Sequence, residues 1–324
     1  MKRLLLSMVV ISLALVSPSI AEDGAWERIL NPEGYRANLI TAVTVDPTNS
    51  ERIFTGTLEC KLYKSEDGGN TWMDTNLPYG CGNGVWSIAV DYSNTEIVYV
   101  NARNGIFKST DGGASWNVVG DSFLYYSTQI VVDPGNPNVL FVMSSYGSLW
   151  KSVDKGVAWI MVNIHGASEW NSLSVDYVNK AVYYGARKDY TTVNVDIYKS
   201  VDNGNTWTYL GIWPSIGKLL VDPADANIIY LGRYKSVDGG NAWSALKYVP
   251  WEISPKNHEI LYGENGYRNA IVKSRDGGLC WEEISPGIYY IYTLTVTDTS
   301  TLFVGTSAGL WRYTDTDINE TQIT

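Results

Sequence analysis

The stretch Ser65-Glu66-Asp67-Gly68-Gly69-Asn70-Thr71-Trp72 carries a pattern, Ser-x-Asp-x-Gly-x-x-Trp, that occurs six times along the 324 residues of the chain. A repeated pattern at this spacing indicates several copies of one supersecondary unit, packed against each other. We expect each copy to form a hairpin turn, in which Asp accepts hydrogen bonds from nearby amides, Gly supplies a positive φ and Trp covers the turn. The six aspartates, spaced 36 to 48 residues apart, are Asp67, Asp111, Asp154, Asp202, Asp238 and Asp276.

Three apolar segments precede each copy in a constant order. A segment ending in Lys-Ser, such as Leu62-Tyr63-Lys64, lies directly before the motif, and Ile53 to Gly56 precedes that segment. Further upstream lies Ala42 to Val45, followed by the turn formers Asp46 and Pro47. Together with the segment after the motif, these predict four strands per unit, which is the architecture of a β-propeller blade.

The last unit, from Tyr292 to Tyr313, lacks both the motif and the segment that follows it. Gly24 to Ile29 resembles that missing segment. Pairing it with the last unit closes a ring and removes two exposed sheet edges. We therefore predict an all-β, seven-bladed propeller of four-stranded antiparallel blades over residues 22–313, its last blade closed by the N-terminal strand, with a polar, disordered tail over residues 314–324.

The N-terminus has the layout of a cleavable signal peptide over residues 1–21, with a basic start, an apolar run and small residues before Glu22. This predicts a secreted, periplasmic or extracellular protein without a membrane anchor after cleavage. The net charge of -10 argues against a nucleic-acid partner. The chain has only two histidines and no zinc-type spacing, so neither a metal nor a cofactor is expected.

Three cysteines allow at most one intramolecular disulfide. Cys60 and Cys81 are the expected pair, and a bridge closing such a loop stabilises by about 3 kcal/mol. Cys280 replaces the Thr, Ser or Ala that precedes Trp in the other motifs, which favours a packed free thiol over a reactive one.

The repeated motif is the Asp box, and the chain resembles the Asp-box (BNR-repeat) propeller superfamily, which includes sialidases, xyloglucan-degrading glycosidases, sortilin-type receptors and photosystem II assembly factors. Sialidases usually carry an Arg-Ile-Pro segment near the first blade, whereas this chain has Arg28-Ile29-Leu30. Xyloglucan-degrading enzymes resemble two propellers facing each other, whereas this chain supplies one.

In propellers, the loops that lead into the innermost strands share one face with the hairpins between the second and third strands. Aromatic and arginine side chains gather in these segments, and such groups suit sugar rings or an extended peptide. Tyr79, Tyr125, Trp213 and Tyr289 are expected on exposed loops. The predicted binding residues are Tyr79, Trp86, Arg103, Tyr125, Tyr126, Trp170, Arg187, Trp213, Arg233, Trp251, Arg268 and Tyr290.

These features predict a non-catalytic binding propeller that recognises a glycan or a protein partner through an aromatic-rich face. The alternative is a glycoside hydrolase of sialidase or glucanase type, which needs a pair of carboxylates or, in sialidases, an arginine triad with a tyrosine. A further alternative is a protein similar to the photosystem II assembly factor. The carboxylates available to a hydrolase are Glu59, Asp121, Glu169, Asp189, Glu252 and Glu264.

Overall fold

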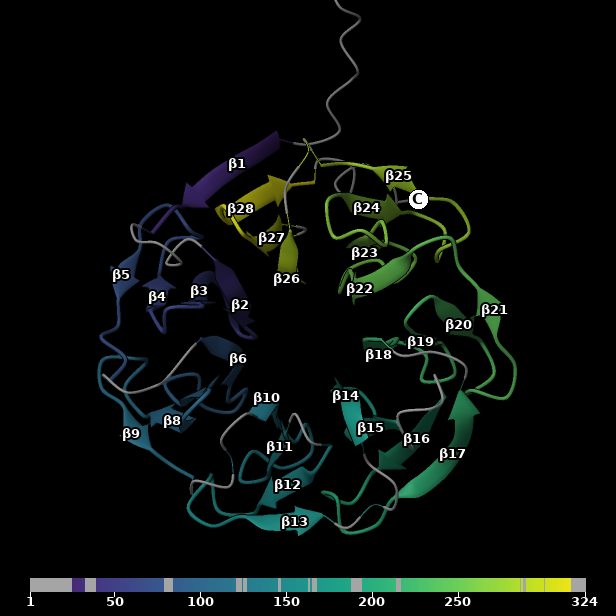
Figure 1. Cartoon of the computed structure of the whole chain (residues 1–324), viewed down its shortest axis with the longest axis horizontal. Helices are drawn as coiled ribbons and strands as arrows, with labels where there is room; N and C mark the ends of the chain where they lie inside the picture. The colour runs from purple at the N-terminus through teal and green to yellow at the C-terminus, as the bar shows by residue number, and fades with distance from the viewer. Residues whose placement is uncertain are drawn as a thin grey trace, which may run out of the picture.

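The computed structural model describes residues 25–32, 39–78, 84–120, 124, 127–144, 147–162, 164, 168–187, 194–213, 217–285, 287, 290–299 and 301–315. The chain forms seven four-stranded antiparallel sheets arranged as a ring, with the innermost strand of each sheet facing the centre (Figure 1). The predicted fold is confirmed. Within the described ranges, no helix is long and apolar enough to cross a membrane.

Blades 1 to 6 each follow the chain from the centre of the ring outward. Blade 1 is β2 (Ile40–Asp46), β3 (Asn49–Thr57), β4 (Leu62–Ser65) and β5 (Met73–Asp74). Blade 2 is β6 (Val85–Val90), β7 (Val98–Ala102), β8 (Gly105–Ser109) and β9 (Asn117–Val118). Blade 3 is β10 (Ser127–Val132), β11 (Leu140–Ser144), β12 (Leu149–Ser152) and β13 (Ile160–Val162).

The next three blades repeat this order. Blade 4 is β14 (Ser168–Asp176), β15 (Ala181–Arg187), β16 (Val195–Ser200) and β17 (Thr208–Trp213). Blade 5 is β18 (Leu219–Val221), β19 (Ile229–Leu231), β20 (Tyr234–Ser236) and β21 (Ser244–Ala245). Blade 6 is β22 (Val249–Ile253), β23 (Leu261–Glu264), β24 (Ile271–Ser274) and β25 (Glu282–Glu283).

Blade 7 joins the two ends of the chain. Its inner strands are β26 (Ile291–Val296), β27 (Thr301–Thr306) and β28 (Gly309–Thr314), and its outer strand is β1 (Ala25–Leu30). Trp26 lies opposite Tyr313, with the ring centroids 4.9 Å apart, and its indole N–H donates to the carbonyl of Ile284 in blade 6 at 2.5 Å. The propeller reaches Asp315, which is buried, two residues beyond its expected end. Residues 1–24 and 316–324 lie outside the described part, so the signal peptide and the disordered tail remain predictions.

The Asp boxes share one hydrogen-bonded turn. In all six, the Ser hydroxyl donates to the Asp carboxylate at 2.7 to 2.9 Å and accepts from the Gly amide at 2.7 to 2.8 Å. The Gly φ angles lie between 71° and 99°, a region that favours glycine. At Asp202, the hydroxyl and amide of Thr206 also donate to the carboxylate and lower its pKa to about 2. The aspartates are therefore engaged in holding their own turns.

The Lys that precedes a box links its blade to the next one in several repeats. The side chain of Lys108 donates to the carbonyl of Lys155 in the next box at 3.1 Å, and Arg312 likewise reaches Gly68 at 2.8 Å. In every blade this basic residue lies opposite an aromatic of the second strand. The pairs are Phe54 with Lys64, Tyr99 with Lys108, Phe141 with Lys151, Tyr183 with Lys199, Tyr230 with Lys235, Tyr262 with Lys273 and Phe303 with Arg312.

Blade 7 has no box to receive the Lys of blade 6. Asp315 takes that place, because its carboxylate lies 2.6 Å from Nζ of Lys273 and both side chains are fully buried. The hydroxyl of Tyr262 donates to the same carboxylate at 2.5 Å. The chain therefore keeps an acceptor at this position even where the repeat is degenerate.

The cysteines differ in part from the expectation. Cys60 is disulfide-bonded, and Cys81, its predicted partner, lies outside the described residues. Cys280 is a free thiol but is exposed, so the prediction that it is packed is wrong. Its position in the box faces solvent beside Asp276, and a hydrogen bond to that carboxylate raises the pKa of the thiol.

Candidate functional site

The innermost strands enclose a channel of about 1120 Å³ along the axis of the ring. Side chains from all seven blades line it, and most are small, as at Thr44, Ala89 and Thr295. The channel has one end where the innermost strands begin and another where they finish. We call the end where they begin the channel mouth.

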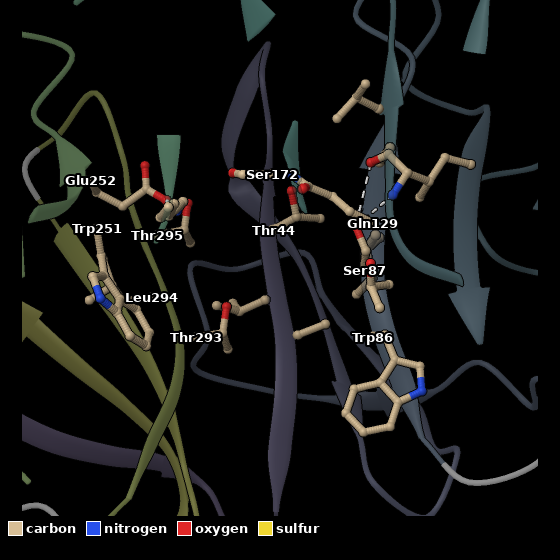
Figure 2. A pocket seen from close by; sticks show the side chains of 18 of the residues that line it. Thr44, Trp86, Ser87, Gln129, Ser172, Trp251, Glu252, Thr293, Leu294 and Thr295 are labelled. Atoms are coloured by element: carbon tan, nitrogen blue, oxygen red, sulfur yellow. Dashed lines mark hydrogen bonds and ion pairs between the residues drawn. The ribbon is translucent and has the colours of Figure 1, made fainter. Parts of the chain in front are cut away.

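Polar side chains in the channel wall link neighbouring blades. The amide of Gln129 donates to the carbonyl of Leu173 at 3.0 Å and accepts from the Leu173 N–H at 3.1 Å, so it bridges blades 3 and 4 (Figure 2). Ser87 accepts from the N–H of Ile130 at 3.3 Å, and Ser172 accepts from Leu219 at 3.1 Å. These contacts fix the spacing of the strands that carry the site.

Three innermost strands place an aromatic residue at a β-bulge. The pairing register shifts between Val85 and Ser87, between Pro250 and Glu252 and between Ile291 and Thr293. A bulge inserts one extra residue and changes the direction of its side chain. The residues at these bulges, which we call the mouth aromatics, are Trp86, Trp251 and Tyr292.

All three mouth aromatics line the channel, and two of them keep a large accessible surface. Trp86 is 40% exposed and Tyr292 is 39% exposed. Figure 2 places Trp86 and Trp251 on opposite sides of the strands that carry Thr44 and Thr293. The mouth therefore offers ring surfaces from blades 2, 6 and 7.

Arg268 lies beside the mouth aromatics in the hairpin between β23 and β24. Its guanidinium carbon lies 5.7 Å from the ring centroid of Trp251, a cation-π contact. The backbone N–H of Arg268 donates to the carboxylate of Glu264 at 2.9 Å, and its carbonyl accepts from the N–H of Ile291 at 2.9 Å. The hairpin of blade 6 is thus attached to the start of β26.

The two carboxylates that line the channel are both engaged. Glu252 lies 2.6 Å from Nζ of Lys218, which joins blades 5 and 6. Glu264 is 7% exposed and accepts from the backbone N–H groups of Gly266 and Arg268 at 2.8 and 2.9 Å. Glu252 therefore bridges two blades, and Glu264 shapes a hairpin.

Of the predicted binding residues, Trp86, Trp251 and Arg268 line the channel. Four other predicted residues do not line the channel: Arg103 in the β7–β8 turn, Arg187 at the end of β15, Arg233 in the β19–β20 turn and Tyr290 before β26. Arg233 donates to the carbonyl of Leu246 at 3.1 Å, and Tyr290 is 65% exposed.

The remaining predicted residues lie outside the described part of the structure or only partly within it. Tyr79, Tyr125 and Tyr126 are outside it, as is Tyr289. Trp170 and Glu169 lie on β14, but their side chains are not described. Of the other possible catalytic carboxylates, Asp121 and Asp189 are outside, and Glu59 is an exposed residue of the β3–β4 turn.

The prediction that Trp213 lies on an exposed loop is wrong. Trp213 is 1% exposed and packs against Trp243 of blade 5, with ring centroids 4.3 Å apart. The physical reason is that the outer strand of blade 4 continues to residue 213, where it pairs with Val195. Trp213 therefore ends a strand and fills the space between two blades.

Tyr292 was not among the predicted binding residues, although its position carries a signal. Tyr292 lies five residues before Thr297, which directly follows the innermost strand of blade 7. Trp86 lies five residues before Asp91, which has the same place in blade 2. Both residues occupy the bulge of their strand. Alignment of the repeats on the end of the innermost strand would have identified it.

No family model matches the chain. A xyloglucanase from Hypocrea jecorina is 26% identical over 207 residues, which cover 57% of this chain and 22% of that protein. The matched region thus spans about a fifth of the length of this curated relative.

Solved structures share the fold. YCF48 from Cyanidioschyzon merolae has a TM-score of 0.66 at 13% identity, covering 90% of this chain and 98% of YCF48. YCF48 bound to D1 peptide has a TM-score of 0.68 at 15% identity, covering 90% and 97%. The GH74 xyloglucanase from Xanthomonas campestris has a TM-score of 0.66 at 16% identity, covering 91% and 54%. The chain is an Asp-box-type propeller related to xyloglucanases in sequence and similar to YCF48 in fold.

Proposed function

We propose that this propeller, related in sequence to xyloglucanases, is a non-catalytic binding protein that holds an extended polysaccharide across its channel mouth. The observation that carries the proposal is the placement of Trp86, Trp251 and Tyr292 at β-bulges around one opening. We further propose that the protein acts after export, because residues 1–21 have the layout of a signal peptide.

The surface chemistry of the mouth supports a sugar ligand. Sugar rings present apolar C–H faces that pack on aromatic rings, and Trp86 and Tyr292 expose about two fifths of their surfaces, 40% and 39%. These side chains belong to different blades, so a ligand that touches both must be extended. The bridges made by Gln129 and Ser87 hold the inner strands in place, which reduces the ordering cost of binding.

The engagement of the channel carboxylates favours binding without hydrolysis. Glycoside hydrolysis needs one carboxyl group that can donate a proton and a second that acts as base or nucleophile. Glu252 is held by Lys218, and Glu264 accepts two backbone hydrogen bonds in a buried hairpin. Within the described lining of the channel, these are the only two carboxylates.

A polysaccharide panel tests the proposal. The purified chain should bind at least one polysaccharide, and Trp86→Ala or Tyr292→Ala should weaken binding by about tenfold, because one stacking contact is worth about 1 kcal/mol or slightly more. Tyr209→Ala is the matched control, since Tyr209 is 49% exposed but lies on the outer strand β17. Equal losses in all three variants, or no polysaccharide binding at all, would contradict the proposal.

The second candidate is a glycoside hydrolase, which the sequence relation to xyloglucanases favours. The same panel distinguishes it when reducing ends are measured after incubation. Release that is lost in Glu252→Gln, in a variant that still binds the polysaccharide, would establish hydrolysis and overturn the non-catalytic proposal.

The third candidate is a peptide-binding protein, since a propeller of the same fold has been solved with a bound peptide. This support is an analogy of fold alone. Extended peptides therefore belong in the panel, and binding of peptides in place of polysaccharides would favour this candidate.

A further inference from the structure

We infer that the channel mouth selects acidic polysaccharides, and that Arg268 receives the carboxylate of a uronic acid unit. The inference rests on the proposed function and names the substrate class of the same site. It concerns one local contact, since the net charge of -10 disfavours polyanions in general. It starts from the geometry of one arginine, which is fixed at its backbone and at its side chain.

The backbone of Arg268 is held in a conformation that non-glycine residues rarely adopt. Its φ is 55°, in the left-handed region, which costs of the order of 1 kcal/mol or more. The N–H of Arg268 donates to the carboxylate of Glu264 at 2.9 Å. The carbonyl of Arg268 accepts from the N–H of Ile291 in the next blade, also at 2.9 Å. A strained backbone held from both sides places the side chain at a defined point of the rim.

The side chain is also positioned, but its charge has no carboxylate partner among the residues that the structure describes. The guanidinium stacks on Trp251 at 5.7 Å, and stacking leaves the in-plane N–H donors at the edge of the group available. The lysine in the channel wall, Lys218, is paired with Glu252. Across the described residues, by contrast, Arg268 forms no ion pair, although it is exposed at the mouth.

A positioned guanidinium fits a planar carboxylate through two parallel hydrogen bonds. A stacking surface lies close by, because Tyr292 directly follows Ile291, whose N–H binds the carbonyl of Arg268. A uronic acid combines the two features, since its ring can stack and its carboxylate can pair. Neutral sugars would use the ring surfaces but leave the Arg268 charge unmatched.

The test compares polygalacturonate oligomers with the same oligomers after their carboxylates have been reduced to alcohols. Calorimetric titration of the purified chain should show at least tenfold tighter binding of the acidic form. Arg268→Gln should abolish this preference while it leaves binding of the reduced form within about twofold. Arg268→Lys should retain part of the preference, because the charge remains but the two parallel bonds do not.

Arg233→Gln serves as the control, since Arg233 is exposed in the β19–β20 turn but does not line the channel. It should keep the full preference, and melting temperatures should show that all variants fold. Equal binding of both oligomers, or binding of neither, would overturn the inference, whereas the proposed function would fall only if no polysaccharide of the panel were bound. Equal binding of a sulfated neutral galactan, or of peptides through their terminal carboxylates, would also overturn it.

Discussion

Removal of the Trp26 side chain should weaken the closure of the ring. Trp26 joins three segments: it lies on β1, packs on Tyr313 of β28 and donates to the carbonyl of Ile284 in blade 6. Complete burial of a Trp makes its replacement by Ala cost about 3 to 5 kcal/mol. Trp26 is only partly buried, so about 2 kcal/mol is expected for the ring. Loss of the hydrogen bond adds about 1 kcal/mol.

Trp26→Ala should therefore lower the free energy of unfolding by about 3 kcal/mol, and the melting temperature by roughly 6 to 12 °C for a domain of this size. Denaturant unfolding and calorimetry measure the two quantities. Trp26→Phe is the matched variant, because it keeps a ring against Tyr313 and loses the bond to Ile284. Hydrogen exchange should accelerate at the amides of β28 before it does so in blades 2 to 4. Unchanged unfolding and unchanged exchange in β28 would refute the reasoning.

Three further predictions concern the turns, the disulfide and the core. Thr206→Ala should raise the pKa of Asp202 from about 2, because the Thr206 hydroxyl is the largest cause of its depression. This carboxylate favours the folded state above its ordinary pKa and loses that effect as the pH falls through that value toward 2. In the variant the stabilisation near neutral pH should therefore be smaller, and its loss should be complete at a higher pH. NMR titration and acid melts check both, with Asp238 as the internal reference. Cys60→Ser should lower stability by about 3 kcal/mol, and the difference from the parent should vanish under reducing conditions, whereas Cys280→Ser should have no such effect. Trp213→Ala should cost about 3 to 5 kcal/mol in denaturant unfolding, and an unchanged midpoint would contradict its burial between blades 4 and 5.

The sequence predicts the ring well because the repeated motif specifies its turns through contacts within a few residues. Asp202 and Gly204 fix a turn through local contacts, and local contacts follow from local sequence. The closure by β1 was also predictable, since Trp26 occupies the place of the Trp in a box. Tertiary contacts between repeats were harder to foresee. The sequence displays Lys108 in a constant position, but its acceptor belongs to the next repeat.

The site was predicted only in part, because strand length and bulge position depend on tertiary pairing. Trp213 stands where an incoming loop was expected, yet β17 extends through it, whereas most outer strands are two or three residues long. Trp86 and Trp251 were identified by type and approximate place. Neither the bulges that direct them nor the left-handed backbone at Arg268 can be read from residue identity.

The contacts from basic residues to the following box also bear on how such a ring can change during evolution. Blade 3 carries a donor, Lys151, that reaches Asn205 of the next box, and its own box accepts from Lys108 of the blade before it. A duplicated blade would bring both halves of the contact with it, as would a blade exchanged with a homologue. Where blade 7 meets blade 1, Arg312 likewise donates to the carbonyl of Gly68 in the first box. New chain ends placed between two blades should therefore leave the ring connected. Circular permutants of this protein are thus a natural starting point for building rings with different arrangements of binding blades.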